Sequence, residues 1–197
     1  MKIVLLIILL FSLISCGGGN STASNIDDNN GLQNNPSITV ENCITTNQNG
    51  LKKCDLLHDN RERFYYIYTP ENLDSNLSIP VLFAFHGYGS SASRHMNYTN
   101  YMQIADENNF VVVYPQGATT PTLSAHWNVG GWTSKSTVKD IEFIETVINL
   151  IQDKIQIDQS RIYSSGMSNG GYMGYHLACN LSEKFAAIAS VTGSMTT

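Results

Sequence analysis

Charged side chains are scarce in this sequence. They make up 14% of the 197 residues, whereas soluble proteins carry about a quarter. Eleven lysine and arginine residues stand against 16 aspartate and glutamate residues, which leaves a net charge of -5 and no basic run. Nucleic-acid binding needs concentrated positive charge, so we expect no nucleic-acid partner. The hydrophobic share of 42% is ordinary and excludes a chain that is disordered throughout.

The sequence also lacks an apolar run long enough to span a membrane. An almost unbroken apolar stretch covers residues 3–14, too short for a hydrocarbon core of about 30 Å. It ends in Leu13-Ile14-Ser15-Cys16, which resembles a bacterial lipobox. We therefore interpret residues 1–15 as a lipoprotein signal peptide and Cys16 as the site of lipid attachment, which anchors the mature protein to a membrane at the bacterial cell surface or in the periplasm. A secretory signal without lipidation is the alternative.

Apolar residues are nearly absent from the next segment, residues 16–36, which consists mainly of glycine, asparagine, serine and aspartate. Such a segment buries too little surface to offset the entropy lost on ordering, so we expect a flexible stalk. Residues 37–62 follow as a cysteine-containing hairpin or extension, and the main folded domain occupies residues 63–197.

Cysteines are few, and none has the spacing to histidine or to other cysteines that a zinc site needs. Cys43 and Cys54 bracket Asn49-Gly50, a strong turn signal that can fold their flanks together, so we expect a disulfide between them. Two free thiols in a surface hairpin are the alternative. We expect Cys179 to stay reduced as an apolar filler on a helix face. No metal and no cofactor are expected.

Strand-like and helix-like segments alternate after the stalk, which is typical of an α/β domain with a mostly parallel sheet and flanking helices. Expected strands cover residues 64–69, 80–85, 110–114, 161–165 and 185–191, and expected helices cover residues 94–108, 138–155 and 169–180. Thr137 and Asp140 suggest a capping box at the start of the second helix. The long aperiodic segment 116–137 between strand and helix indicates a loop that borders a site.

The segment Gly166-Met167-Ser168-Asn169-Gly170 carries the chemistry. It lies between an expected strand and an expected glycine-containing helix, and small residues on both sides of Ser168 permit the sharp turn of a nucleophile elbow. The sequence therefore predicts Ser168 as a catalytic nucleophile. A structural turn without catalytic function is the alternative.

A second motif, His86-Gly87-Tyr88-Gly89, ends an apolar strand. This turn supplies an oxyanion-hole amide in serine esterases, so we expect the backbone amides of Tyr88 and Asn169 to polarise a substrate carbonyl. We expect His86 and Gly87 to support this loop, and His86 to brace it rather than act as a base.

These motifs together resemble the α/β-hydrolase esterases of the polyhydroxybutyrate depolymerase and feruloyl esterase type, near carbohydrate esterase family one. The resemblance extends from about Arg63 to Gly193 and includes, besides the two motifs above, Val113-Tyr114-Pro115-Gln116-Gly117, Trp127-Asn128, Asp140-Ile141-Glu142-Phe143-Ile144 and Arg161-Ile162-Tyr163. It implies a serine esterase that cleaves hydroxyalkanoate polyesters or acyl esters on plant polysaccharides through an acyl-enzyme. By the same resemblance Trp127 lies near the substrate cleft, and packing of a long loop is its alternative role.

The sequence departs from this family after Ser168. The catalytic triad of the fold runs in the order serine, acid, histidine, yet residues 169–197 contain no aspartate, one glutamate and one histidine. That histidine, His176, lies on the helix of the elbow and is carried about 12 Å along its axis. We therefore expect an N-terminal part of an esterase, cut after the strand that follows the elbow and inactive by itself. A surface lipoprotein with a non-catalytic, esterase-like binding cleft is the alternative, and a serine peptidase of the same fold is a third.

Overall fold

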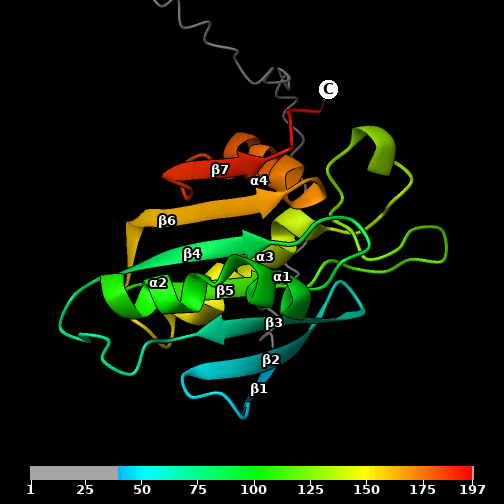
Figure 1. Cartoon of the computed structure of the whole chain (residues 1–197). Helices are drawn as coiled ribbons and strands as arrows, with labels where there is room; N and C mark the ends of the chain where they lie inside the picture. Colours follow the sequence, from blue (N-terminus) through cyan, green and yellow to red (C-terminus); the bar gives the residue numbers. More distant parts are fainter. Residues whose placement is uncertain (1–39, 197) are drawn as a thin grey trace, which may run out of the picture. The chain divides into compact units, whose positions relative to one another are not determined.

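Seven strands form one mixed sheet in the computed structural model, which describes residues 40–196 (Figure 1). The strand order is β1-β2-β3-β5-β4-β6-β7. The half made of β5, β4, β6 and β7 is parallel, whereas β1, β2 and β3 pair antiparallel and β3 joins β5 antiparallel. The strands are β1 (Glu41–Thr45), β2 (Leu51–His58), β3 (Arg61–Tyr68), β4 (Ile79–Phe85), β5 (Val111–Pro115), β6 (Ile157–Met167) and β7 (Ala187–Val191).

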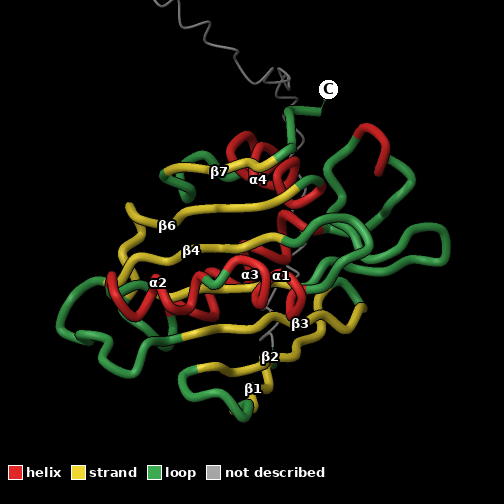
Figure 2. Tube along the Cα trace, in the orientation of Figure 1, coloured by secondary structure: helices red, strands yellow, loops and turns green. Residues whose placement is uncertain are grey.

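Helices cover both faces of this sheet (Figure 2). On one face, α1 (Ala92–Thr99) and α2 (Tyr101–Asn108) pack on side chains such as Val112 and Tyr114 of β5. On the other, α3 (Asp140–Gln152) and α4 (Asn169–Asn180) share a larger core with Phe83 of β4. Because apolar layers cover both faces, all five residues of β5 are buried. The predicted α/β class is therefore confirmed.

The predicted helix 94–108 is divided in the structure. Asn100 adopts a left-handed conformation with φ of 52°, which ends α1 and begins α2. Asparagine tolerates this conformation better than most residues, so the polar stretch contains its own break. The boundaries predicted for residues 169–180 coincide with those of α4.

The predicted capping box at the start of α3 is wrong. The N-cap residue is Lys139, and its side chain makes no capping hydrogen bond. Asp140 is instead buried and paired with Arg63 of β3. The Asp140 carboxylate therefore forms an ion pair with the distant Arg63 and does not cap its own helix.

Cysteine pairing departs from expectation at one position. Cys43 of β1 lies opposite Cys54 of β2 in the ladder, and the two form a disulfide. Cys179 on α4 is also disulfide-bonded, so the expectation that it stays reduced is wrong. The residue is half-buried, so it is not the enclosed apolar filler that its place on the helix suggested.

The predictions for the N-terminus lie outside the described residues. These are the signal peptide 1–15, lipid attachment at Cys16 and the stalk 16–36. Residues Ser37–Thr197 form one compact unit. Within residues 40–196, no helix combines the length and apolarity that crossing a membrane requires.

Candidate active site

Ser168 occupies a sharp turn between the end of β6 and the start of α4. Its φ of 53° and ψ of -119° lie in a region that costs a non-glycine residue about 1–3 kcal/mol. Its backbone N–H donates to the Val191 carbonyl at 2.8 Å, and its carbonyl accepts from the Tyr172 N–H at 2.9 Å. Such strain persists only where the surroundings hold it, and it presents the half-buried serine at the carboxyl edge of the sheet.

Two glycines let this turn form. A Cβ atom added to Gly166 would lie 2.3 Å from the backbone of Gly170, and one added to Gly170 would lie 2.1 Å from the Phe85 carbonyl oxygen. Both distances are far below van der Waals contact, so any side chain would force α4 away from β4 and β6. The small residues that flank Ser168 are therefore required by the close approach of backbone to backbone.

The predicted oxyanion turn lies beside this serine. Phe85 pairs with Gly166 across the parallel strands β4 and β6, so the chain leaves both strands at the same level. A Cβ added to Gly87 would lie 3.6 Å from the Ser168 Cβ. Within residues 40–196, neither the Tyr88 N–H nor the Asn169 N–H donates a hydrogen bond. The turn thus brings two available amide donors to the neighbourhood of the serine.

His86 braces this turn with both ring nitrogens. The Nε2 atom accepts the Gly117 N–H at 2.9 Å, so the proton resides on Nδ1, which donates to the Gly87 carbonyl at 2.8 Å. The ring is fully buried, and this burial lowers the pKa of His86 below its usual value. A neutral imidazole with both nitrogens engaged supports the loop and has no lone pair left to accept a proton from Ser168.

The other histidines are also placed away from base catalysis. Buried His126 donates from Nδ1 to the Ser124 carbonyl and accepts from the Ser136 hydroxyl at Nε2. Burial lowers the pKa of His95 to about 4, and it lowers the pKa of His176 on α4. All five histidines of the chain belong to the described residues, and in this part of the chain none of them hydrogen-bonds to Ser168.

Trp127 packs the long loop onto the oxyanion turn. Its side chain is fully buried and packs edge-on against Phe85 with ring centroids 5.1 Å apart. Its indole N–H donates to the His86 carbonyl at 2.9 Å. These contacts favour the alternative role of Trp127, packing of the long loop, over a position in the substrate cleft.

A buried ion pair organises the same loop and was missed by the sequence reasoning. Arg63 donates to Asp140 at 2.7 Å and to the Gln116 carbonyl at 3.1 Å, and its guanidinium lies 3.9 Å from the Phe143 ring centroid. The second carboxylate oxygen of Asp140 accepts the Asn128 N–H at 2.7 Å. The only sequence signal was the presence of Arg63 and Asp140 in the family-like stretches.

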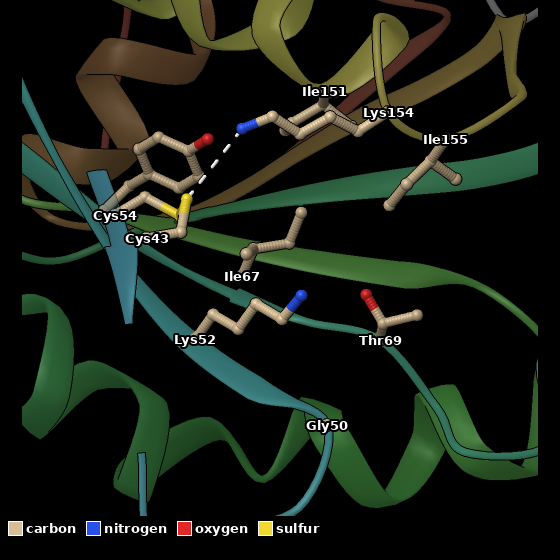
Figure 3. A pocket seen from close by; sticks show the side chains of 10 residues that line it. Cys43, Gly50, Lys52, Cys54, Ile67, Thr69, Ile151, Lys154 and Ile155 are labelled. Atoms are coloured by element: carbon tan, nitrogen blue, oxygen red, sulfur yellow. Dashed lines mark hydrogen bonds between the residues drawn. A yellow bond between two sulfur atoms is a disulfide. The ribbon is translucent and has the colours of Figure 1, made fainter. Parts of the chain in front are cut away.

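A separate pocket of about 450 Å³ lies between β2, β3 and the end of α3 (Figure 3). Its wall includes the Cys43–Cys54 disulfide, and Ile67, Ile155 and Lys52 also line it. Glu41 and the two cysteines cluster there at metal-ligand spacing. Because the sulfurs are bonded to each other, they offer no thiolate to a metal ion. The pocket holds no predicted site residue besides this cysteine pair.

A strained serine between a central parallel strand and a helix, on a mixed sheet covered by helices, defines the α/β-hydrolase class. Solved structures agree on the fold: an acetyl xylan esterase from Aspergillus awamori matches with a TM-score of 0.57 and 22% identity over 68% of this chain and 47% of that one. An S-formylglutathione hydrolase from Agrobacterium tumefaciens matches with a TM-score of 0.63 and 18% identity over 77% and 62% of the two chains.

Residues 96–197, just over half of the sequence, match the prolyl oligopeptidase family, and the chain belongs to that family. It is similar to feruloyl esterase B of Thermothelomyces thermophilus, with 35% identity over 65% of this chain and 43% of the relative. A bifunctional acetylxylan esterase/xylanase of Neocallimastix patriciarum is 32% identical over 66% of this chain and 18% of its own length. The expected resemblance to feruloyl-type esterases is thus confirmed, and the chain spans less than half of either relative.

Proposed function

We propose that this chain carries the nucleophile and oxyanion hole of a serine carboxylic ester hydrolase. The observation that supports the proposal most strongly is the positive φ of Ser168 beside the Gly87–Tyr88 turn. Backbone strain lowers the stability of a fold and is concentrated at functional sites. The two available amides beside Ser168 can stabilise an oxyanion, so the strain coincides with groups that catalysis needs.

In the proposed reaction, the Ser168 Oγ attacks the ester carbonyl carbon while its proton passes to an imidazole base. The oxygen of the tetrahedral intermediate accepts hydrogen bonds from the amides of Tyr88 and Asn169, each contributing about 2.7–4 kcal/mol. The intermediate collapses by breaking the ester C–O bond, and the alcohol leaves with the proton. Water then cleaves the acyl-enzyme and releases the acid.

We propose acyl esters on polysaccharides as the substrate class. The names of the curated relatives, feruloyl esterase and acetylxylan esterase, support this choice. Polyhydroxyalkanoate polyesters are the second substrate class that the motifs suggest. Rates of hydrolysis of an acylated polysaccharide and of a polyhydroxyalkanoate distinguish the two classes.

A non-catalytic binding cleft is the second candidate function. The observation in its favour is that, in the part of the chain that the structure describes, none of the five histidines hydrogen-bonds to Ser168. The ring nitrogens of His86 and His126 have other partners. A serine peptidase is a third candidate, favoured by the match to the prolyl oligopeptidase family, and it needs the same imidazole.

Added imidazole separates these candidates. Without it, we expect the 197-residue chain to hydrolyse p-nitrophenyl butyrate at a rate that Ser168→Ala does not measurably change. With 2-methylimidazole in the buffer, we expect faster release of p-nitrophenol by the wild type than by Ser168→Ala, and a butyryl group on the Ser168 peptide in mass spectra. Equal rates under both conditions and no acyl adduct would favour the binding cleft. A peptide p-nitroanilide cleaved faster than the ester would favour the peptidase.

We also propose that the protein is exported and anchored through lipid on Cys16. Because Cys43 and Cys54 already pair with each other, a disulfide of Cys179 then joins it to a cysteine of another chain. Radiolabelled fatty acid is expected to enter the wild type but not the Cys16→Ser variant. Equal labelling of both proteins would contradict the proposal.

A further inference from the structure

Two exposed aromatic rings lie side by side next to the candidate active site. Tyr88 is 43% exposed and Trp132 is 49% exposed, and their ring centroids are 5.3 Å apart at an interplanar angle of 73°. Large apolar rings held together in solvent mark contact surfaces more often than single exposed residues do. Neither ring has a role in the core.

Tyr88 is held by a hydrogen bond of the next residue and by one at its own hydroxyl. The neighbouring Gly89 N–H donates to the Ala125 carbonyl at 2.8 Å, and the Tyr88 hydroxyl accepts the Ser124 N–H at 3.2 Å. These bonds tie the oxyanion turn to the long loop 116–137. The phenol ring is therefore fixed over that loop with one edge in solvent.

Trp132 stands in a short 3₁₀ turn, Gly131–Thr133, that is equally restrained. The buried Thr133 hydroxyl accepts the Val129 N–H and donates to the Gly130 carbonyl, both at 2.8 Å. Within residues 40–196, the Trp132 indole N–H has no acceptor, in contrast to that of Trp127. This turn thus holds the Trp132 ring in solvent with its indole N–H available to a ligand.

Tyr88 connects the pair to the serine, because the Trp132 ring contacts the Tyr88 ring. Tyr88 directly follows Gly87, whose added Cβ would lie 3.6 Å from the Ser168 Cβ. Next to Trp132, an added Cβ on Gly131 would lie 3.4 Å from Thr196. The segment that ends in Thr196 passes Gly193, where an added Cβ would lie 2.6 Å from the Tyr172 amide of α4. The pair therefore belongs to the rim of the same site.

The surroundings favour a neutral, hydroxyl-rich ligand. Residues 117–137 contain a single charged side chain, Lys135, and no carboxylate, but many serine and threonine residues. A pyranose ring offers one face of C–H groups to an aromatic ring and hydroxyls at its edge to polar partners. We propose that Tyr88 and Trp132 bind a pyranose unit of a neutral polysaccharide and so position its ester at Ser168; this assignment rests on the proposed function.

Binding can be measured without catalysis in the full chain carrying Ser168→Ala. The sequence has only two tryptophans, and because Trp127 is fully buried, acrylamide quenching reports Trp132. We expect xylohexaose to protect Trp132 from acrylamide and to bind in titration calorimetry. Trp132→Ala should weaken this binding about tenfold or more, as loss of an aromatic anchor does, whereas Trp132→Phe should retain most of it. Tyr98→Ala, which removes a 75% exposed ring on α1, is the matched control and should bind as the parent does.

Equal affinity of the Trp132→Ala and parent proteins for xylohexaose would overturn the assignment. So would binding of ferulic acid but not xylohexaose, because the pair would then hold the acyl group. If Trp132→Ala does not fold, absence of acrylamide protection in the folded parent is the overturning result. Because these proteins lack Ser168, sugar binding is measured independently of catalysis. The sugar-binding proposal and the esterase proposal can therefore fail separately.

Discussion

The carboxamide of Asn169 forms two hydrogen bonds with the backbone of Trp127. Its Oδ1 accepts the Trp127 N–H at 2.7 Å, and its Nδ2 donates to the Trp127 carbonyl at 3.0 Å. Both residues are fully buried. The Asn169 side chain thus satisfies the N–H and the carbonyl of Trp127, as a neighbouring strand would. The backbone amide of the same residue is one of the two proposed oxyanion donors.

Replacing this carboxamide should destabilise the fold. In Asn169→Ala, the Trp127 N–H and carbonyl remain buried without partners, so we expect the free energy of unfolding to fall by about 2–4 kcal/mol. Urea unfolding followed by circular dichroism measures the change. Asn108→Ala on the exposed side of α2 serves as the control and should change stability by less than about 0.5 kcal/mol. A similar small change in both variants would show that the two bonds contribute little.

Breaking the Arg63–Asp140 pair should be more costly. Asp140→Ala leaves a guanidinium buried without its charge partner and frees the Asn128 N–H, so we expect a loss of about 3–5 kcal/mol. Glu145→Ala removes a partner of Lys184 in a partly exposed pair with atoms 3.6 Å apart and should cost less than about 1 kcal/mol. Urea unfolding compares the two, and equal losses would contradict the role of burial.

Acid should weaken the fold through His95. Burial, with the nearby His86 as a smaller cause, lowers the pKa of His95 from 6.5 to about 4. The unfolded chain therefore binds this proton more tightly, so the contribution to stability is complete above pH 6.5 and is lost as the pH falls toward 4. His95→Leu should remove about 2–3 kcal/mol of the stability lost between pH 7 and pH 4.5. Tyr98→Ala on the same helix should leave the pH dependence as steep as in the wild type, and an equally steep dependence in His95→Leu would refute the assignment.

The Cys43–Cys54 disulfide should stabilise the β1–β2 hairpin. Its ends are separated by 11 positions, for which loop-closure entropy gives about 3 kcal/mol. The double variant Cys43→Ala/Cys54→Ala should therefore unfold at a correspondingly lower urea concentration. Each single variant should lose a similar amount, and unchanged midpoints would contradict the expected contribution.

The sequence was sufficient for the local elements. The continuous apolar run of β5, the helix 169–180 and the glycines around Ser168 all reflect short-range rules: side-chain period, propensity and the space that a tight turn leaves. The break at Asn100 was also local, but a single asparagine in a polar stretch is a weak signal.

Tertiary structure alone decided the partners of the polar and aromatic groups. Asp140 could cap its own helix or pair across 77 positions, and only the packing of β3 against the loop selected Arg63. Trp127 and Trp132 are five positions apart in one loop, yet one is fully buried and the other faces solvent beside Tyr88. Short-range patterns fix backbone geometry because their energies are local. Burial and pairing depend on which distant segments meet, and this meeting is determined by the whole core.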